Sequence, residues 1–598
     1  MHPTGIRAET AVSLLVALLL AALPFVVSPG GLEKFRLPKD VVFGVSATLI
    51  AGIFFGANGV RRLWKWRSWE GLLLLAVGYL VANSLWNRRG ISAWAVCWVV
   101  GGVLLLLAVS RGVPQADHPR LWLVLGSASA VNAFLALLQY YGRFPLLIRS
   151  SGETLEGRLT PAGLIGDVNT GGFVFGLAAL MLLYPLAAQK KPGLRIFAGG
   201  LLALNLVGLI ITQTLSAMLG FGVAFVLWLG LHGWWLVHTH KNPRKAYGLT
   251  AAAMGSVVLV LLVVFLVSGT GERITGAWSA IRAGDPTEWT AGRYPVYLIT
   301  WRMIRDYPVL GRGLGSFGVD FFRYRTETDL SRLTMIDQPG AFREAHNDYL
   351  QVWEELGLVG LALFLGLLVI PCVEALRKAR VSKDPKSVYR TGMLVLGMVF
   401  TAIACLAFFP FRLSLTALCV VLLLAGLRSI AHQPDEKTHQ PLPASQSWRW
   451  RAVLLGVVTV IVLYYGVQHL RANSEMGLAA EILERGYSPS LSPRAKRIYA
   501  ETALVRLRRA EAMSPIYENY NLQGSANILL GNHEEAARQY ERAARYIPSP
   551  EVLTNQAAAL LAIGQKEKAR RLLETALKYN PNYPNASRAL EYLKSSQN

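Results

Sequence analysis

Long apolar segments recur along most of this chain, and they constrain its fold more than any other feature. A helix needs about 20 mostly apolar residues to cross a bilayer. Thirteen candidate segments lie near 10–28, 41–57, 70–86, 92–110, 121–141, 171–188, 196–213, 216–237, 248–268, 353–375, 391–409, 412–430 and 452–470. Because a backbone in lipid must satisfy its own hydrogen bonds, these segments predict an all-α, polytopic membrane bundle. We expect the first segment to be a retained helix rather than a removed signal peptide.

The composition agrees with a membrane protein. Hydrophobic residues make up 53% of the 598 residues and charged residues only 16%, below the roughly 25% of a soluble globular chain. The formal net charge of +23 fits basic cytoplasmic loops. Binding to nucleic acid would explain the charge but not the hydropathy, so no nucleic-acid partner is expected.

The cysteines and histidines give no sign of a metal site or a disulfide framework. Each of the four cysteines lies in an apolar run, none belongs to a CxxC pair, and none adjoins a histidine cluster; they are Cys97, Cys372, Cys405 and Cys419. Burial as small apolar residues is the simpler interpretation. We therefore predict no bound metal and no cofactor.

Basic residues in the short loops indicate the orientation. If the N-terminus is cytoplasmic, the basic clusters at 61–67, 190–195, 241–245 and 377–390 all face the cytoplasm. Three residues of an opposite loop, Lys34, Arg36 and Lys39, depart from this distribution. The long segments 142–170 and 269–352 are then extracytoplasmic, and an odd number of spans places the C-terminal tail with them. This count depends on dividing 196–237 into two spans at Gln213-Thr214.

The tail, residues 472–598, is polar and repetitive. Five residues recur after 33 positions: Gly531, Ala536, Tyr540, Ala543 and Pro548 correspond to Gly564, Ala569, Leu573, Ala576 and Pro581. This pattern resembles the tetratricopeptide repeat, in which small residues lie where two helices cross. A generic array of helical hairpins is the alternative. Such repeats usually bind a protein partner, although here they could equally brace the membrane domain.

Both long outer loops contain arginine but no lysine. Ten arginines lie in 269–352, and 142–170 adds Arg143, Arg149 and Arg158. A guanidinium binds phosphate oxygens with two parallel donors and stays protonated. The pattern predicts a phosphate or pyrophosphate ligand for two or three of these arginines. The rest are expected to pair with acidic residues of the loop, such as Asp306.

Two motifs stand out in 269–352. Gly311, Gly313 and Gly315 alternate after Tyr307-Pro308, which indicates a tight turn where the backbone closely approaches another segment. His346 lies where this loop enters the tenth helix. A histidine there could act as a general base, or it could serve as a cap or hydrogen-bonding residue.

Together, these motifs resemble the superfamily of O-antigen ligases and O-antigen polymerases. The resemblance rests on Arg293, Tyr307-Pro308, Gly311-x-Gly313-x-Gly315-x-Phe317, His346-Asn347-x-Tyr349-Leu350 and Glu355-x-Gly357-x-x-Gly360. Upstream, Arg158 and the stretch 163–169 resemble another family motif, with Asp167 and Val168 in place of Asn-Pro. Leu215 stands where the family commonly has arginine, so that anionic contact is not expected here.

The resemblance implies a glycosyltransferase-C-like bundle in the bacterial inner membrane. It implies an inverting, metal-independent transfer of a glycan from a polyprenyl-diphosphate carrier to a lipid or protein acceptor. His346 and Arg293 would be catalytic, as general base and diphosphate contact. The implied substrate-binding residues are Arg158, Arg312, Asn347 and Tyr349, with packing as the alternative for Tyr349. The predicted parts are an N-terminal bundle (1–268), a periplasmic catalytic loop (269–352), further spanning helices (353–471) and a periplasmic repeat domain (472–598).

Several functions remain open from the sequence. The chain could be a ligase, a polymerase that extends the glycan on its carrier, or a protein O-oligosaccharyltransferase. A transporter would normally place ionisable residues inside its helices, and few are found there. A scaffold built around the repeats would not need loops rich in arginine.

Overall fold

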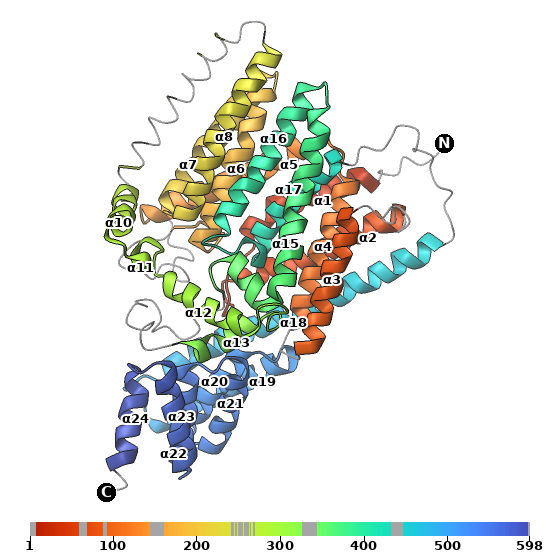
Figure 1. The fold of residues 1–598 in the computed structure, drawn as a ribbon. Coiled ribbons are helices and arrows are strands. Elements are labelled where there is room, and N and C mark those ends of the chain that lie inside the picture. Colours follow the sequence, from red (N-terminus) through yellow and green to blue (C-terminus); the bar gives the residue numbers. More distant parts are fainter. Residues whose placement is uncertain are drawn as a thin grey trace.

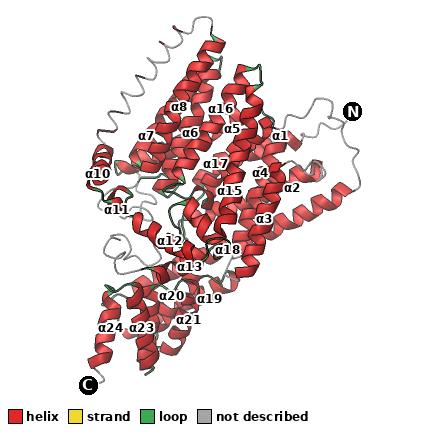
Figure 2. Cartoon of the chain, in the orientation of Figure 1, coloured by secondary structure: helices red, strands yellow, loops and turns green. Residues whose placement is uncertain are grey.

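The structure is a computed structural model that describes residues 8–58, 68–87, 93–143, 161–240, 269–325, 344–431 and 447–595, with isolated positions between 244 and 266. Figure 2 shows that the described residues form helices joined by short loops, without a strand. The predicted all-α class is confirmed.

The spanning bundle is built from apolar helices. Their bounds are α1 Ala8–Ala22, α2 Arg36–Asn58, α3 Ser68–Asn87, α4 Ala93–Gly112, α5 His118–Tyr140, α6 Val168–Ala188, α7 Pro192–Ile211, α8 Leu215–Thr239, α15 Asp348–Arg380, α16 Pro385–Ala404, α17 Ser414–Ala431 and α18 Ser447–Gly486. Within the described part of the chain, ten helices are long and apolar enough to cross a membrane, and α3 and α4 contribute shorter apolar stretches. The span expected at 248–268 lies almost entirely outside the described residues.

The predicted division of 196–237 is confirmed. Helix α7 ends at Ile211, and α8 begins at Leu215. Gln213 takes the left-handed backbone conformation between them, with φ of 52°. Thr214 Oγ1 donates to the carbonyl of Val168 (3.0 Å), which attaches this turn to the start of α6.

Within the 269–352 segment, the described residues 269–325 fold into short helices at one end of the bundle. They are α10 Thr270–Ala283, α11 Pro286–Trp289, α12 Tyr294–Asp306, α13 Ser316–Asp320 and the 3₁₀ turn η4 Phe321–Tyr324. A small apolar core, separate from that of the bundle, joins α12, α13, η4 and Ala345. We call it the loop core; it consists of Val296, Ile299, Met303, Phe317, Phe321, Phe322 and Ala345.

The tail is a stack of helices below this end of the bundle in Figure 1. Its elements are α19 Pro493–Met513, α20 Tyr517–Leu529, α21 His533–Tyr546, α22 Pro550–Ala562, α23 Lys566–Tyr579 and α24 Pro584–Ser595. The recurring glycines Gly531 and Gly564 occupy equivalent turns, with φ of 75° and 78°. Helix α18 runs without interruption through the predicted domain boundary at 471/472.

Candidate active site

His346 lies in a constrained turn directly before α15. Its φ of 53° is left-handed, which is uncommon for a residue with a side chain and often marks a functional site. Asn347 caps α15 by accepting a hydrogen bond from the Leu350 amide (3.0 Å), and its Nδ2 donates to the carbonyl of Leu406 (2.9 Å). The cap and the contact with the α16–α17 connection together fix the backbone next to His346, from which the imidazole extends.

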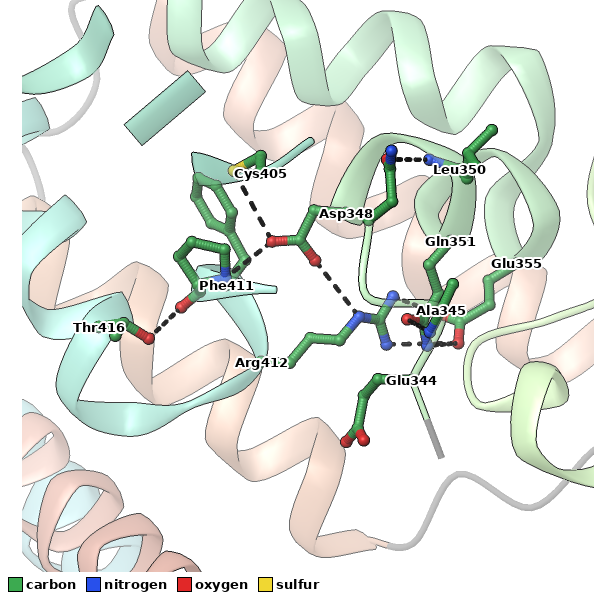
Figure 3. A network of polar contacts seen from close by, with 12 residues as sticks. Glu344, Ala345, Asp348, Leu350, Gln351, Glu355, Cys405, Phe411, Arg412 and Thr416 are labelled. Carbon is green, nitrogen blue, oxygen red and sulfur yellow. Dashed lines mark hydrogen bonds and ion pairs between the residues drawn. The ribbon is translucent and has the colours of Figure 1, made fainter. Parts of the chain in front are cut away.

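Arg412, from the α16–α17 connection, holds the first turns of α15. Its two terminal nitrogens bind the Glu355 carboxylate at 3.3 and 2.9 Å, and Nε lies 3.5 Å from Asp348 Oδ1. Figure 3 shows its guanidinium between these two carboxylates. Gln351 extends the network, since it donates to Glu355 (3.1 Å) and accepts from the Ala345 amide (2.8 Å). The residue before His346 is thus tied to the same arginine.

A second arginine reaches this turn from α2. Arg36 Nη1 binds Glu344 Oε1 at 2.6 Å, and Nη2 donates to the carbonyl of Arg412 (3.3 Å). Lys39, one turn later, is 4% exposed and donates to the carbonyls of Val26 (2.8 Å) and Leu164 (2.9 Å). Arg36 and Lys39, two of the three basic residues that did not fit the loop-charge distribution, therefore hold neighbouring segments together.

Arg293 approaches His346 from the start of α12. Burial and, next, the positive charge of Arg293 lower the pKa of His346 to about 4. Tyr297, one turn into α12, donates to the carbonyls of His346 (3.3 Å) and Leu406 (3.2 Å). The structure therefore brings together the two residues predicted to be catalytic.

Arg312 belongs to a different cluster. It is 8% exposed and donates to Asp320 (3.0 Å) and to the Tyr324 hydroxyl (2.5 Å). Its guanidinium also lies over the rings of Tyr307 and Tyr324, at 4.8 and 5.1 Å from their centroids. These contacts support a structural role, in line with the expectation that most loop arginines pair with acids. Its substrate-binding role stays a prediction.

The glycine motif makes the predicted close backbone approach, and the segment that it packs against is α15. The amides of Arg312 and Gly313 donate to the carbonyls of Glu354 (3.0 Å) and Glu355 (2.8 Å). A Cβ on Gly311 would lie 2.4 Å from the Glu355 carbonyl oxygen. The motif thus fixes the loop against the kinked start of α15.

The other predicted residues are placed as follows. The Tyr349 hydroxyl donates to the carbonyl of Ala402 (2.8 Å), which favours its packing role. Arg158 lies outside the described residues. Three further site residues, Arg412, Arg36 and Tyr297, are not marked by any sequence motif, because their relation to His346 exists only in three dimensions.

The arrangement offers a specific chemistry. With a pKa near 4, His346 is neutral at pH 7 and able to accept a proton. Arginine remains cationic in proteins and can stabilise a developing anion beside it. Within the described residues, no three His, Cys, Asp or Glu side chains lie together as a metal-binding group.

Comparison with known proteins identifies the central part of the chain. Residues 200–365 match the model of a family described as O-antigen ligase. The match runs from α7 into α15 and includes Arg293, Arg312 and His346, whereas Arg412 lies beyond it. A search of curated proteins found no significant match.

Proposed function

We propose that this multi-pass membrane protein, which has an O-antigen ligase domain at residues 200–365, is an inverting glycosyltransferase that uses a polyprenyl-diphosphate-linked glycan. The observation that carries the proposal is that α12, which begins next to Arg293, lies against the His346 turn within the matched region, where the Tyr297 hydroxyl donates to the carbonyl of His346 (3.3 Å).

In the proposed reaction, an acceptor hydroxyl attacks the anomeric carbon of the donor sugar. His346 takes the hydroxyl proton as the new C–O bond forms. The bond from the anomeric carbon to the diphosphate oxygen breaks, and polyprenyl diphosphate leaves with the electron pair. Arg293 binds the leaving diphosphate, whose negative charge would raise the pKa of His346 and make it a stronger base in the complex. The reaction needs no metal in this scheme.

The proposed location is the bacterial inner membrane, with the 269–352 segment and the tail in the periplasm. Basic clusters on the opposite loops support this orientation. A glycan donor embedded in the outer leaflet would then meet His346 near the membrane surface, where α15 begins.

The test is glycan transfer by the purified protein in nanodiscs, with a polyprenyl-diphosphate glycan as donor and EDTA present. His346→Ala is expected to abolish release of polyprenyl diphosphate, and Arg293→Lys to reduce it because an ammonium lacks the two-pronged contact. Arg323→Lys, at a half-exposed arginine of the same segment, is the matched control. Full activity of His346→Ala would overturn the general-base role.

The same experiment separates the acceptor classes. A ladder of glycan lengths on the carrier would indicate a polymerase, whereas transfer to a lipid or protein acceptor would indicate a ligase or an O-oligosaccharyltransferase. A folded protein without turnover on any acceptor would favour a scaffold or transporter.

A further inference from the structure

The tail contacts the loop core directly. Ile547, which follows α21, and Tyr579, the last residue of α23, pack against this cluster. The cluster includes Ala345, the neighbour of His346, and Val296, which lies one turn of α12 after Arg293. The tail therefore packs against an apolar core that includes near neighbours of both proposed catalytic residues.

A second contact joins α18 to the turn before α2. The buried Asn473 side chain accepts from the Glu33 amide (2.7 Å) and donates to the Glu33 carbonyl (2.9 Å). The backbone carbonyl of Asn473 accepts from the Leu32 amide (3.1 Å). The fit is close, because a Cβ on Gly477 would lie 2.4 Å from the carbonyl oxygen of Gly30. Backbone and side chain together set the position of this turn.

The second contact also leads to the site. Arg36 begins α2 three residues after Glu33, and it holds Glu344, two residues before His346. The tail thus supports the His346 turn from two directions, through the loop core and through the start of α2.

We propose that the C-terminal helices position the active site, with Ile547, Tyr579 and Asn473 as positioning residues. This inference rests on the function proposed above. It makes the tail part of the catalytic unit, in addition to any partner that it binds. Displacement of reacting groups by about 1 Å can cost on the order of 10²-fold in rate, so these contacts are expected to affect turnover.

The test compares full-length variants in the same transfer assay. Ile547→Ala combined with Tyr579→Ala is expected to lower kcat at least tenfold while KM changes less than twofold. Ile547→Leu with Tyr579→Phe, which keeps the apolar contact, should restore kcat. Tyr592→Ala, at a tyrosine of α24 that is 67% exposed, is the control. Hydrogen exchange should rise at 294–303 and around His346 only in the first variant.

Asn473→Ala tests the contact between α18 and the turn before α2. This test does not depend on whether the Ile547→Ala, Tyr579→Ala variant folds. Its control is Ser474→Ala, which removes only a bond to the carbonyl of Leu470 within α18. Wild-type kcat in the folded double variant and in Asn473→Ala would overturn the positioning role. His346→Ala is measured in the same assay. If it abolishes transfer, the proposed function stands even when the positioning role is overturned. If it is active, the proposed function itself is wrong.

Discussion

Arg412 pairs with two carboxylates that lie seven residues apart on α15, about two helical turns, and this geometry suits only a guanidinium. Arg412→Lys is expected to lower transfer about 10-fold to 100-fold, because one ammonium cannot bind both Glu355 oxygens and Asp348. The rate of polyprenyl diphosphate release measures this effect. Arg323→Lys, whose partner Asp320 is also held by Arg312, should remain active. Equal rates for the two variants would contradict the prediction.

The lowered pKa of His346 determines the expected pH dependence. The free enzyme should lose kcat/KM as the pH falls through about 4, rather than through the ordinary histidine value near 6.5. The same group lowers stability in acid: the unfolded chain takes up its proton near pH 6.5, the folded chain only near 4, so stability falls as the pH drops across that window. An acid limb of kcat/KM at about 6.5 would show that His346 is solvated as in a free peptide.

At the scale of elements, the kink in α15 depends on Gly357. Its φ is 68°, and a Cβ there would lie 2.1 Å from the carbonyl oxygen of Val309. Gly357→Ala is therefore expected to destabilise the protein by about 2 kcal/mol or more. Gly222→Ala, in α8, where an added Cβ would meet no atom outside its own stretch of helix within 4 Å, is the control. Denaturation in detergent measures both, and equal stability of the two variants would refute the requirement for glycine.

An arginine inside the bundle joins three helices. Arg428 of α17, which is 2% exposed, binds Glu70 of α3 (2.8 Å) and Glu374 of α15, and lies over the Trp69 ring. Arg428→Met should lower the free energy of unfolding by about 3 kcal/mol, since Glu70 and Glu374 lose this arginine inside the bundle. Glu70 keeps a second arginine, Arg111. The same substitution at Arg497, an exposed residue of α19, should change it by less than about 0.5 kcal/mol. A loss at Arg428 no larger than at Arg497 would mean that the carboxylates find other partners.

At the scale of the whole molecule, packing of the tail on the loop core requires both to lie on one side of the membrane. Because the 269–352 segment is proposed to be periplasmic, a C-terminal alkaline phosphatase fusion is expected to be active, and a fusion to a cytoplasm-dependent fluorescent protein to be dark. The same reporters placed in the 377–390 loop should behave in the opposite way. A fluorescent C-terminal fusion would reverse the proposed orientation.

Much of the fold followed from local chemistry. An apolar run of sufficient length must become a helix in lipid, because only internal hydrogen bonds satisfy its backbone. The break at Gln213-Thr214 and the tight turn at Gly311 were predictable from the residues of each turn, whereas the packing of Gly311 on Glu355 joins residues far apart in the chain. The extent of α18 was less accessible: its polar half continues a helix that the apolar span begins, and hydropathy ends the span at 470.

The site divides along the same line. Sequence by itself singled out His346 and the glycine turn through short motifs with recognisable chemistry, and Arg293 through the resemblance to the O-antigen ligase and polymerase superfamily. Only the tertiary structure decided that Arg412 holds the first turns of α15, that Arg36 reaches Glu344, and that Ile547 and Tyr579 pack against the loop core. These partners lie far apart along the chain, so no local sequence pattern predicts that they are in contact. Their pairing is decided by how the helices pack, which brings distant charges and apolar side chains to one place.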